Sequence, residues 1–130
     1  MKPSKLSLND WIQDEEGRYK VTHICEDTVI ASYNKGAVSL QPENILPVLL
    51  TNDHLTLNGF KVSEVNRVHY IEDSERNLIY SLHYIPIVKS WYVTYKDSED
   101  LCFEIQYVHE LQHLLRLTRL IDVADNFKIK

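Results

Sequence analysis

Positive charge is scarce in this chain, and that scarcity excludes one broad class of function. The 130 residues contain 14 Lys and Arg against 19 Asp and Glu, which gives a formal net charge of -5. A general nucleic-acid binder needs a basic field around the phosphates, so we expect no such role here. A small local pocket for an anionic ligand remains compatible with this charge.

Cysteine, glycine, proline and long apolar runs are also rare. The chain has two cysteines, three glycines and four prolines, and it contains no low-complexity linker and no CxxC pair. We expect Cys25 and Cys102 to be small buried residues in a reducing compartment. No apolar run approaches the roughly 20 residues of a membrane span, and residues 1–13 lack the apolar core of a signal peptide. These absences predict a cytoplasmic protein without a membrane partner.

The sequence does contain a series of short segments in which apolar and polar residues alternate. The clearest are residues 19–25 and 78–85, and this period of two indicates half-buried strands. Turn-forming residues bound further strand-like segments, which are residues 10–13, 28–33, 37–40, 60–63, 67–71, 91–95 and 101–105. A tight turn at residues 34–36 is typical of a hairpin. The short turns predict antiparallel pairing throughout.

Breaks in this pattern divide the chain into two lobes near residue 48. We predict an α+β fold, with a small SH3-like β-meander at residues 1–48 and an antiparallel sheet with helices at 49–130. Thr51 suits an N-cap and Gly59 a helix stop, which predicts a short helix over residues 52–58. A longer amphipathic helix is expected over about residues 106–119, packed on the second sheet. A frayed tail is expected from residue 122 onward.

The longer helix has an apolar face and a polar face. At about 100° per residue, the apolar face gathers Leu111, Leu114, Leu115 and Thr118, which we expect to pack on the sheet. The opposite face gathers His109, Gln112, His113 and Arg116. We expect this second face to be exposed to solvent or to contact another subunit.

The polar face includes HELQH, an HExxH motif that begins at His109. On a helix, His109 and His113 can share Zn²⁺, and Glu110 can act as general base on the metal-bound water. A catalytic zinc needs a third ligand, however, and Arg119 stands where one class of zinc protease has it. Arg116 adds a fixed cation that repels a metal ion. We therefore expect no metal and no cofactor, and we keep a zinc-dependent hydrolase as an alternative.

The same helix resembles a C-terminal signature, YVHxLQxxxRL, of short uncharacterised proteins from Bacteroidota genomes, their mobile elements and their phages. Residues 107–117 carry this likeness. Residues 55–60 are similar to the LxxNGF turn of those proteins, and residues 9–12 to their GDWV strand, with Asn9 in place of Gly. In that family Glu110 is often replaced by Gln and His113 by Asn, which implies that HExxH is incidental. The resemblance implies a phage or mobile-element accessory protein and carries no established activity.

Cations and aromatic rings interleave on the predicted strands of the second lobe, which favours a pocket for a nucleotide-like anion. The interleaved residues are Arg67, His69, Lys89, Trp91, Tyr92 and Tyr95. Trp91, Tyr92 or Tyr95 would supply a stacking ring, and Arg67 or Lys89 the charge. The competing interpretation is that the rings fill the core and the cations are solvated.

Our leading hypothesis is a non-enzymatic protein that sequesters a small nucleotide-like signal of antiphage defence. A single thin sheet offers little concavity, so we expect the site to lie at the interface of a homo-oligomer. A second subunit would then add helix residues to the pocket, namely His109, His113 and Arg116. Besides the hydrolase, the remaining alternative is a protein–protein interaction module that uses the exposed helix face.

Overall fold

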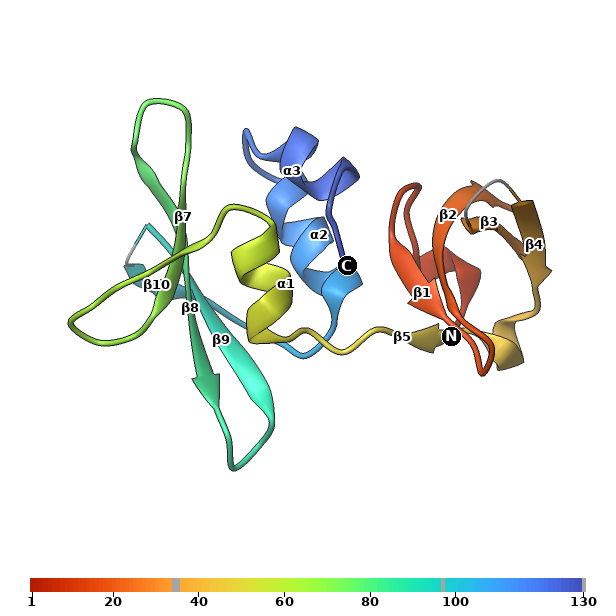
Figure 1. Ribbon diagram of the computed structural model, residues 1–130, viewed down its shortest axis with the longest axis horizontal. Coiled ribbons are helices and arrows are strands. Elements are labelled where there is room, and N and C mark those ends of the chain that lie inside the picture. Colours follow the sequence, from red (N-terminus) through yellow and green to blue (C-terminus); the bar gives the residue numbers. More distant parts are fainter. Residues whose placement is uncertain (34–35, 97, 130) are drawn as a thin grey trace.

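The computed structural model describes residues 1–33, 36–96 and 98–129. Within them, two antiparallel five-stranded sheets enclose a layer of helices (Figure 1). The strand order is β4-β3-β2-β1-β5 in the N-terminal sheet and β10-β9-β8-β7-β6 in the C-terminal sheet. The predicted α+β class, with an N-terminal strand meander followed by a second antiparallel sheet, is confirmed.

The N-terminal sheet is a meander whose last strand returns to the first. Ile12 of β1 pairs with Tyr19 of β2 on one side and with Pro47 of β5 on the other. The elements are η1 (Pro3–Lys5), β1 (Trp11–Gln13), β2 (Arg18–Ile24), β3 (Val29–Tyr33), β4 (Gly36–Leu40), η2 (Pro42–Asn44) and β5 (Leu46–Pro47). Residues 34 and 35 of the predicted hairpin turn lie outside the described residues.

The C-terminal part begins with the predicted short helix. Thr51 Oγ1 accepts a hydrogen bond from the backbone N–H of His54, and Gly59 follows the helix with a φ of 87°. Both boundary predictions are confirmed. The elements are α1 (Asn52–Leu57), β6 (Lys61–Val62), β7 (His69–Glu72), β8 (Leu78–Ile85), β9 (Ser90–Tyr95), β10 (Ser98–Ile105), α2 (Val108–Arg116) and α3 (Ile121–Asp125).

Two apolar clusters stabilise these layers. The first is formed by residues up to Ile45, and the second begins at Val48. Within the second cluster, Leu111 and Leu115 of α2 are fully buried. The hydroxyl of Tyr80 on β8 donates to the carbonyl of Leu114 at 2.6 Å. The apolar face of α2 therefore packs on the C-terminal sheet, as predicted.

Two sequence-based expectations are wrong. The chain after α2 does not fray, because it forms α3 and then buries Phe127, whose carbonyl accepts a 2.6 Å hydrogen bond from Nε1 of Trp11. Cys25 and Cys102 are both exposed rather than buried. Cys25 follows the end of β2, and Cys102 lies on β10 at the edge of its sheet, where no neighbouring strand covers it.

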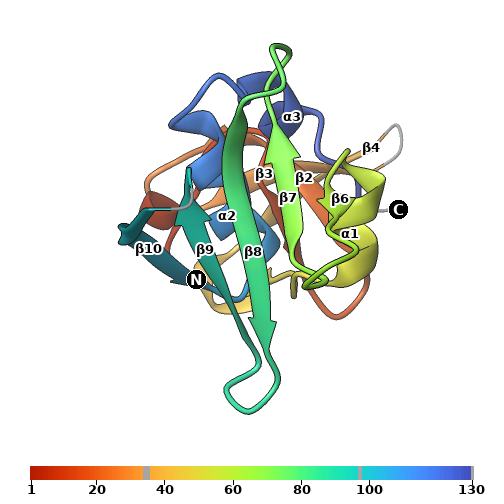
Figure 2. The same ribbon diagram turned by 90° about the vertical axis from the view of Figure 1, so that its left-hand side faces the viewer.

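The position of α2 determines the surroundings of the HExxH motif. Figure 2 shows the C-terminal sheet in front with the helices behind it, and in Figure 1 the N-terminal sheet closes the other side of those helices. Both faces of α2 are therefore covered by protein. Among the described residues, no helix is long and apolar enough to cross a membrane.

Candidate functional site

The polar face of α2 contacts the N-terminal lobe. Gln112 is fully buried, and its Oε1 accepts a hydrogen bond from the backbone N–H of Trp11 at 3.0 Å. Its Nε2 donates to the carbonyls of Asn9 at 2.8 Å and Ala124 at 2.9 Å. The expectation that this face is exposed is wrong, because the segment leading into β1 covers it.

A buried carboxylate joins the same two parts of the chain. Asp10 is fully buried, and its two oxygens lie 2.6 Å from Nη1 of Arg116 and 2.6 Å from Nε2 of His113. The backbone N–H of Ser7 donates to the same carboxylate at 2.8 Å. Nε of Arg116 also donates to Asp125 at 3.1 Å. Because a buried charge is costly unless it is paired and hydrogen-bonded, these contacts explain why Asp10 is tolerated between the lobes.

Glu110 begins the helix rather than facing an open cleft. Its Oε1 accepts hydrogen bonds from the backbone N–H groups of Gln106 and Tyr107, both at 3.0 Å. A Glu at the third helical position commonly satisfies free N–H groups at a helix start. This carboxylate therefore has a structural role in the fold.

His109 is buried between rings. It stacks on Tyr107 with a centroid separation of 6.1 Å and meets His113 edge-on at 5.6 Å. Its Nδ1 is buried without a hydrogen-bond partner among the described residues. Burial lowers the pKa of the His109 imidazole, because removal from water disfavours the charged form.

The surroundings of the motif do not supply a metal site. In the part of the chain that the structure describes, no group of three or more His, Cys, Asp or Glu side chains is placed to hold a metal ion. His113 is instead engaged by Asp10, and Glu110 by the start of α2. The geometry therefore gives the hydrolase alternative no support.

A different set of side chains converges at one end of the C-terminal sheet. They line a cavity of about 350 Å³, which we call the basic pocket. The lining residues come from the start of α1, the β6–β7 loop with its flanking strands, and β8 and β9. They are Asn52, Val62, Asn66, Arg67, His69, His83, Tyr84 and Trp91.

Three rings form much of the basic pocket. Trp91 is only 3% exposed, and its Nε1 donates to the carbonyl of Leu50 at 3.3 Å. His69 meets Trp91 edge-on at 5.7 Å, and the ring of Tyr84 lies 5.0 Å from that of Trp91. Tyr84 is 41% exposed, so it presents the accessible ring while Trp91 supports it. Burial lowers the pKa of His69.

Arg67 supplies the fixed charge of the basic pocket. It has a φ of 57°, and its backbone N–H donates to the carbonyl of Ser63 at 2.8 Å. Oδ1 of Asn66 accepts from the backbone N–H of Val68, which shapes the same loop. The guanidinium makes no hydrogen bond or ion pair with the rest of the described chain. It is therefore free to contact a ligand.

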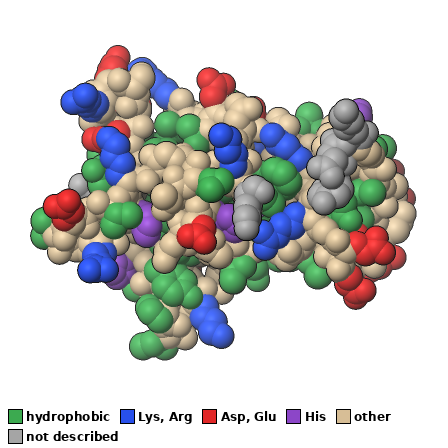
Figure 3. All heavy atoms as spheres, in the orientation of Figure 1, with side chains coloured by type: hydrophobic (Ala, Val, Ile, Leu, Met, Phe, Trp, Pro, Cys, Tyr) green, Lys and Arg blue, Asp and Glu red, His purple; other side chains and the backbone are tan. Residues whose placement is uncertain are grey.

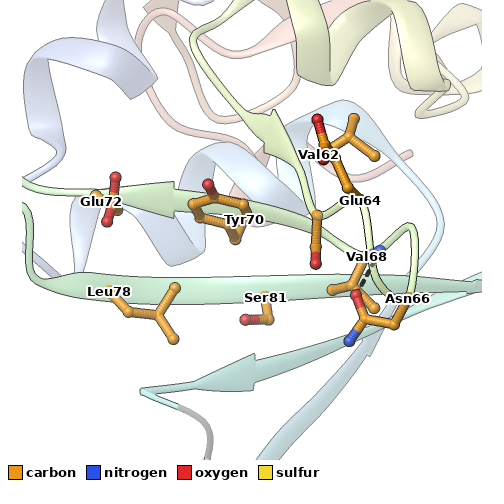
Figure 4. A pocket seen from close by; sticks show the side chains of 9 residues that line it. Val62, Glu64, Asn66, Val68, Tyr70, Glu72, Leu78 and Ser81 are labelled. Atoms are coloured by element: carbon orange, nitrogen blue, oxygen red, sulfur yellow. Dashed lines mark hydrogen bonds between the residues drawn. The ribbon is translucent and has the colours of Figure 1, made fainter.

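A second hollow lies next to the basic pocket, and its lining is acidic. It measures about 660 Å³, and Figure 4 shows Tyr70 between Glu64 and Glu72 along its length. Glu72 is already paired with Lys61 at 2.9 Å. This hollow and three others described on the surface each contain at least one Asp or Glu, whereas the lining of the basic pocket contains none.

Of the eight residues predicted to bind a ligand, the structure brings two, Arg67 and Trp91, into the basic pocket. Tyr92 is exposed and pairs across the sheet with His83, and Lys89 lies in the β8–β9 turn. Neither lines the pocket. Tyr95 lines a separate hollow. The three residues of α2 in the prediction lie in the interface between the lobes, and these are His109, His113 and Arg116.

Sequence reasoning missed His83 and Tyr84. Consecutive residues of a strand point to opposite faces of a sheet, so strand periodicity does not place both in one pocket. They meet there because the pocket lies at the end of the sheet, beside the β6–β7 loop. The sequence offers only a weak signal for them: both side chains are rings, and their strand directly precedes the predicted strand that contains Trp91.

The basic pocket can offer charged donors from Arg67, ring nitrogens from two histidines and a flat ring from Tyr84. No protein-family model, curated protein or solved structure matches this chain. The geometry of the described residues therefore carries the functional argument.

Proposed function

We propose that this protein binds and sequesters a small anionic ligand with a flat ring, of the nucleotide class, in the basic pocket. One observation carries this proposal. In a chain of net charge -5, the pocket gathers Arg67, His69 and His83 with no carboxylate in its lining. The fixed positive charge of Arg67, with no carboxylate in the same lining, favours a specific anion over the nonspecific binding of nucleic acid by this acidic protein.

The rings support a ligand with a base. Stacking of a base on an aromatic side chain contributes about 1–3 kcal/mol, and the exposed ring of Tyr84 offers such a face beside Arg67. The buried Trp91 packs against Tyr84 and limits its movement. A rigid ring loses little conformational entropy when a ligand binds, which favours affinity.

For the biological role, we propose that the ligand is a nucleotide-like signal of antiphage defence. The support is the resemblance to phage and mobile-element proteins carried by residues 107–117, together with the chemistry of the basic pocket. Sequestration requires affinity and no turnover, which agrees with the structural roles of Glu110 and His113.

A second candidate function is a protein–protein interaction module, and one observation favours it. The β8–β9 hairpin projects from the molecule, and apolar side chains cover that projection in Figure 3. At its turn, Ile87 is 94% exposed and Val88 is half-exposed. The polar face of α2, which the sequence analysis expected to be exposed, does not support this alternative, because the N-terminal lobe covers it.

The test compares two arginines with the same backbone conformation. Arg67 and Arg76 have φ values of 57° and 66°, and Asn tolerates this left-handed region well. We expect Arg67→Asn to weaken binding of a cyclic mono- or dinucleotide by about tenfold or more, as loss of a charge-assisted hydrogen bond does. Arg76→Asn removes the same charge outside the pocket and should leave affinity unchanged. Titration calorimetry measures both.

Inorganic phosphate serves as the second probe. A nucleotide should bind more tightly than phosphate because only the nucleotide can stack on Tyr84, and Tyr84→Ala should remove that difference. Equal losses in Arg67→Asn and Arg76→Asn would show that the effect is general electrostatics, and the proposed site would then be wrong.

A further inference from the structure

We propose that the protein forms a two-fold symmetric dimer by antiparallel pairing of β10 with β10 of a second copy. An edge strand presents a row of unpaired N–H and C=O groups, which proteins usually protect. Of the four edges in the described sheets, β5 and β6 have two residues each, β4 has five and β10 has eight. β10 is therefore the longest edge strand, and its regular pairing with β9 covers residues 102–105, because the register shifts between Ser98 and Cys102.

Two of the other edges, those formed by β5 and β6, contain residues that discourage strand addition. β5 ends in Pro47, which has no N–H to donate, and β6 carries Lys61. Proline and lysine are common means of preventing strand addition. Residues 101–105 of β10 include neither.

The side chains at this edge are apolar and incompletely covered. Phe103 pairs with Val93 across β9, which places it on the face of the sheet that packs against the core. Even so, Phe103 is 39% exposed and Leu101 is 47% exposed, whereas Val93 is fully buried. The difference arises because no strand lies beyond β10. A further strand would cover both side chains.

The strand is self-complementary about Phe103. A two-fold axis there places Phe103 opposite Phe103 of the second copy, and Leu101 opposite Ile105 of the second copy. All three pairs are then apolar, with Phe103 and Ile105 on the same face of the regular ladder and Leu101 in the segment where the register of β10 shifts. Aromatic and aliphatic cross-strand pairs stabilise antiparallel sheets. On the other face, Cys102 lies opposite Glu104 of the second copy. An axis at Glu104 would instead oppose two like charges, which is destabilising.

The dimer would leave the basic pocket accessible. The β6–β7 loop that supplies Arg67 lies toward the opposite edge of the sheet from β10. Pairing of β10 therefore does not depend on the proposed ligand. Failure of either proposal would not affect the other.

The first experiment measures mass by sedimentation equilibrium over a concentration series. We expect the full chain to be a dimer and Phe103→Lys to be a monomer. Ile87→Lys places the same charge at an exposed position in the β8–β9 turn and should remain a dimer. Leu101→Lys is a second test at the edge should Phe103→Lys lose its native circular dichroism. A wild-type monomer at all concentrations, or a dimer that survives both edge variants, overturns the proposal.

The second experiment tests the register by disulfide formation. Directly opposite residues of antiparallel strands have Cα atoms about 4.5–5.5 Å apart, which a disulfide can bridge. In a Cys25→Ser background, we expect Glu104→Cys to give a covalent dimer with Cys102 under mild oxidation. The background protein, which retains Cys102 alone, should not. Linking of the background protein through Cys102 would overturn the Phe103 axis, and a dimer that links in neither case would overturn β10 as the interface.

Discussion

Gln112 shows how a polar residue becomes part of a core. On the helix it lies among polar neighbours, yet in the fold both ends of its amide are satisfied by three backbone groups from two segments, residues 9–11 and Ala124. Buried polar groups are tolerated when they are hydrogen-bonded and are costly when they are not. The same reasoning explains the buried Asp10.

We expect Gln112→Leu to lower the free energy of unfolding by about 2–4 kcal/mol, because it leaves buried backbone groups without partners. Urea denaturation measures this loss. Gln41→Leu is the matched control at an exposed position, where we expect a change within about 0.5 kcal/mol. A loss at Gln112 as small as that of the control would contradict the structural role of its amide.

The pH dependence of stability follows from the buried His109. Its folded pKa lies below the ordinary value of 6.5, mainly through burial, although Asp10 and Glu110 act in the opposite direction. Below about pH 6.5 the unfolded chain takes up a proton that the folded chain resists, so the free energy of unfolding decreases as the pH falls. His54 and His69 contribute with the same sign, because burial also lowers their pKa values.

We therefore expect His109→Gln to reduce the loss of stability between about pH 7 and pH 5. Urea denaturation at several pH values gives the slope. The same substitution at His23, which is exposed, should leave the slope as it is in the wild type. A slope that is unchanged in His109→Gln would mean that this residue is not the source of the effect.

At the scale of elements, α2 is the helix on which both lobes depend. One face contributes Leu111 to the core under the C-terminal sheet, and the other contributes Gln112 and Arg116 to the N-terminal lobe. Between the two sheets, every residue of α2 is buried or half-buried. Its polar residues therefore belong to an interface within the chain.

Two leucines test which face of α2 is packed, because one is buried and the other is exposed. Leu111→Ala should lower the free energy of unfolding by about 2–5 kcal/mol, the usual cost of truncating a core leucine. Leu117, just after α2, is 77% exposed, and Leu117→Ala should cost less than about 0.5 kcal/mol. Denaturant titration of both variants measures the contrast, and similar values would mean that the packed face is assigned wrongly.

Glu110 tests whether the motif is structural or catalytic. Glu110→Gln retains an oxygen that accepts from the backbone of Gln106 and Tyr107, so we expect nearly unchanged stability and intact nucleotide binding. Glu110→Ala removes the acceptor and should cost about 1 kcal/mol. Thermal melts and calorimetry measure these effects. Loss of biological activity in a folded Glu110→Gln protein would move the hydrolase hypothesis to first place.

At the scale of the whole molecule, the contact of Asp10 with Arg116 couples the two lobes. In a double-mutant cycle, Asp10→Ala and Arg116→Ala should show a coupling of about 1–3 kcal/mol, because the carboxylate is fully buried and the pair is hydrogen-bonded. The exposed pair Lys61 and Glu72 is the control and should show less than about 1 kcal/mol. Equal couplings would show that the lobe contact contributes no more than a surface pair.

The sequence by itself determined the elements of this protein. Alternation over residues 78–85 predicted β8 in full, Thr51 and Gly59 marked the ends of α1, and the spacing of Leu111 and Leu115 identified the packed face of α2. Each of these signals is local, because side-chain period and capping depend on residues a few positions apart. For the same reason the α+β order of strands and helices could be read along the chain.

Only the tertiary structure decided what covers the second face of α2 and which residues share a pocket. Arg116 meets Asp10 across 106 positions of chain, and helix periodicity says nothing about such a partner. The cations and rings that interleave in the sequence likewise do not all meet in the fold. Arg67 and Trp91 line the basic pocket together with Tyr84 of β8, whereas Lys89, Tyr92 and Tyr95 lie elsewhere. A local pattern specifies which way a side chain points, but the packing of the lobes specifies what it meets.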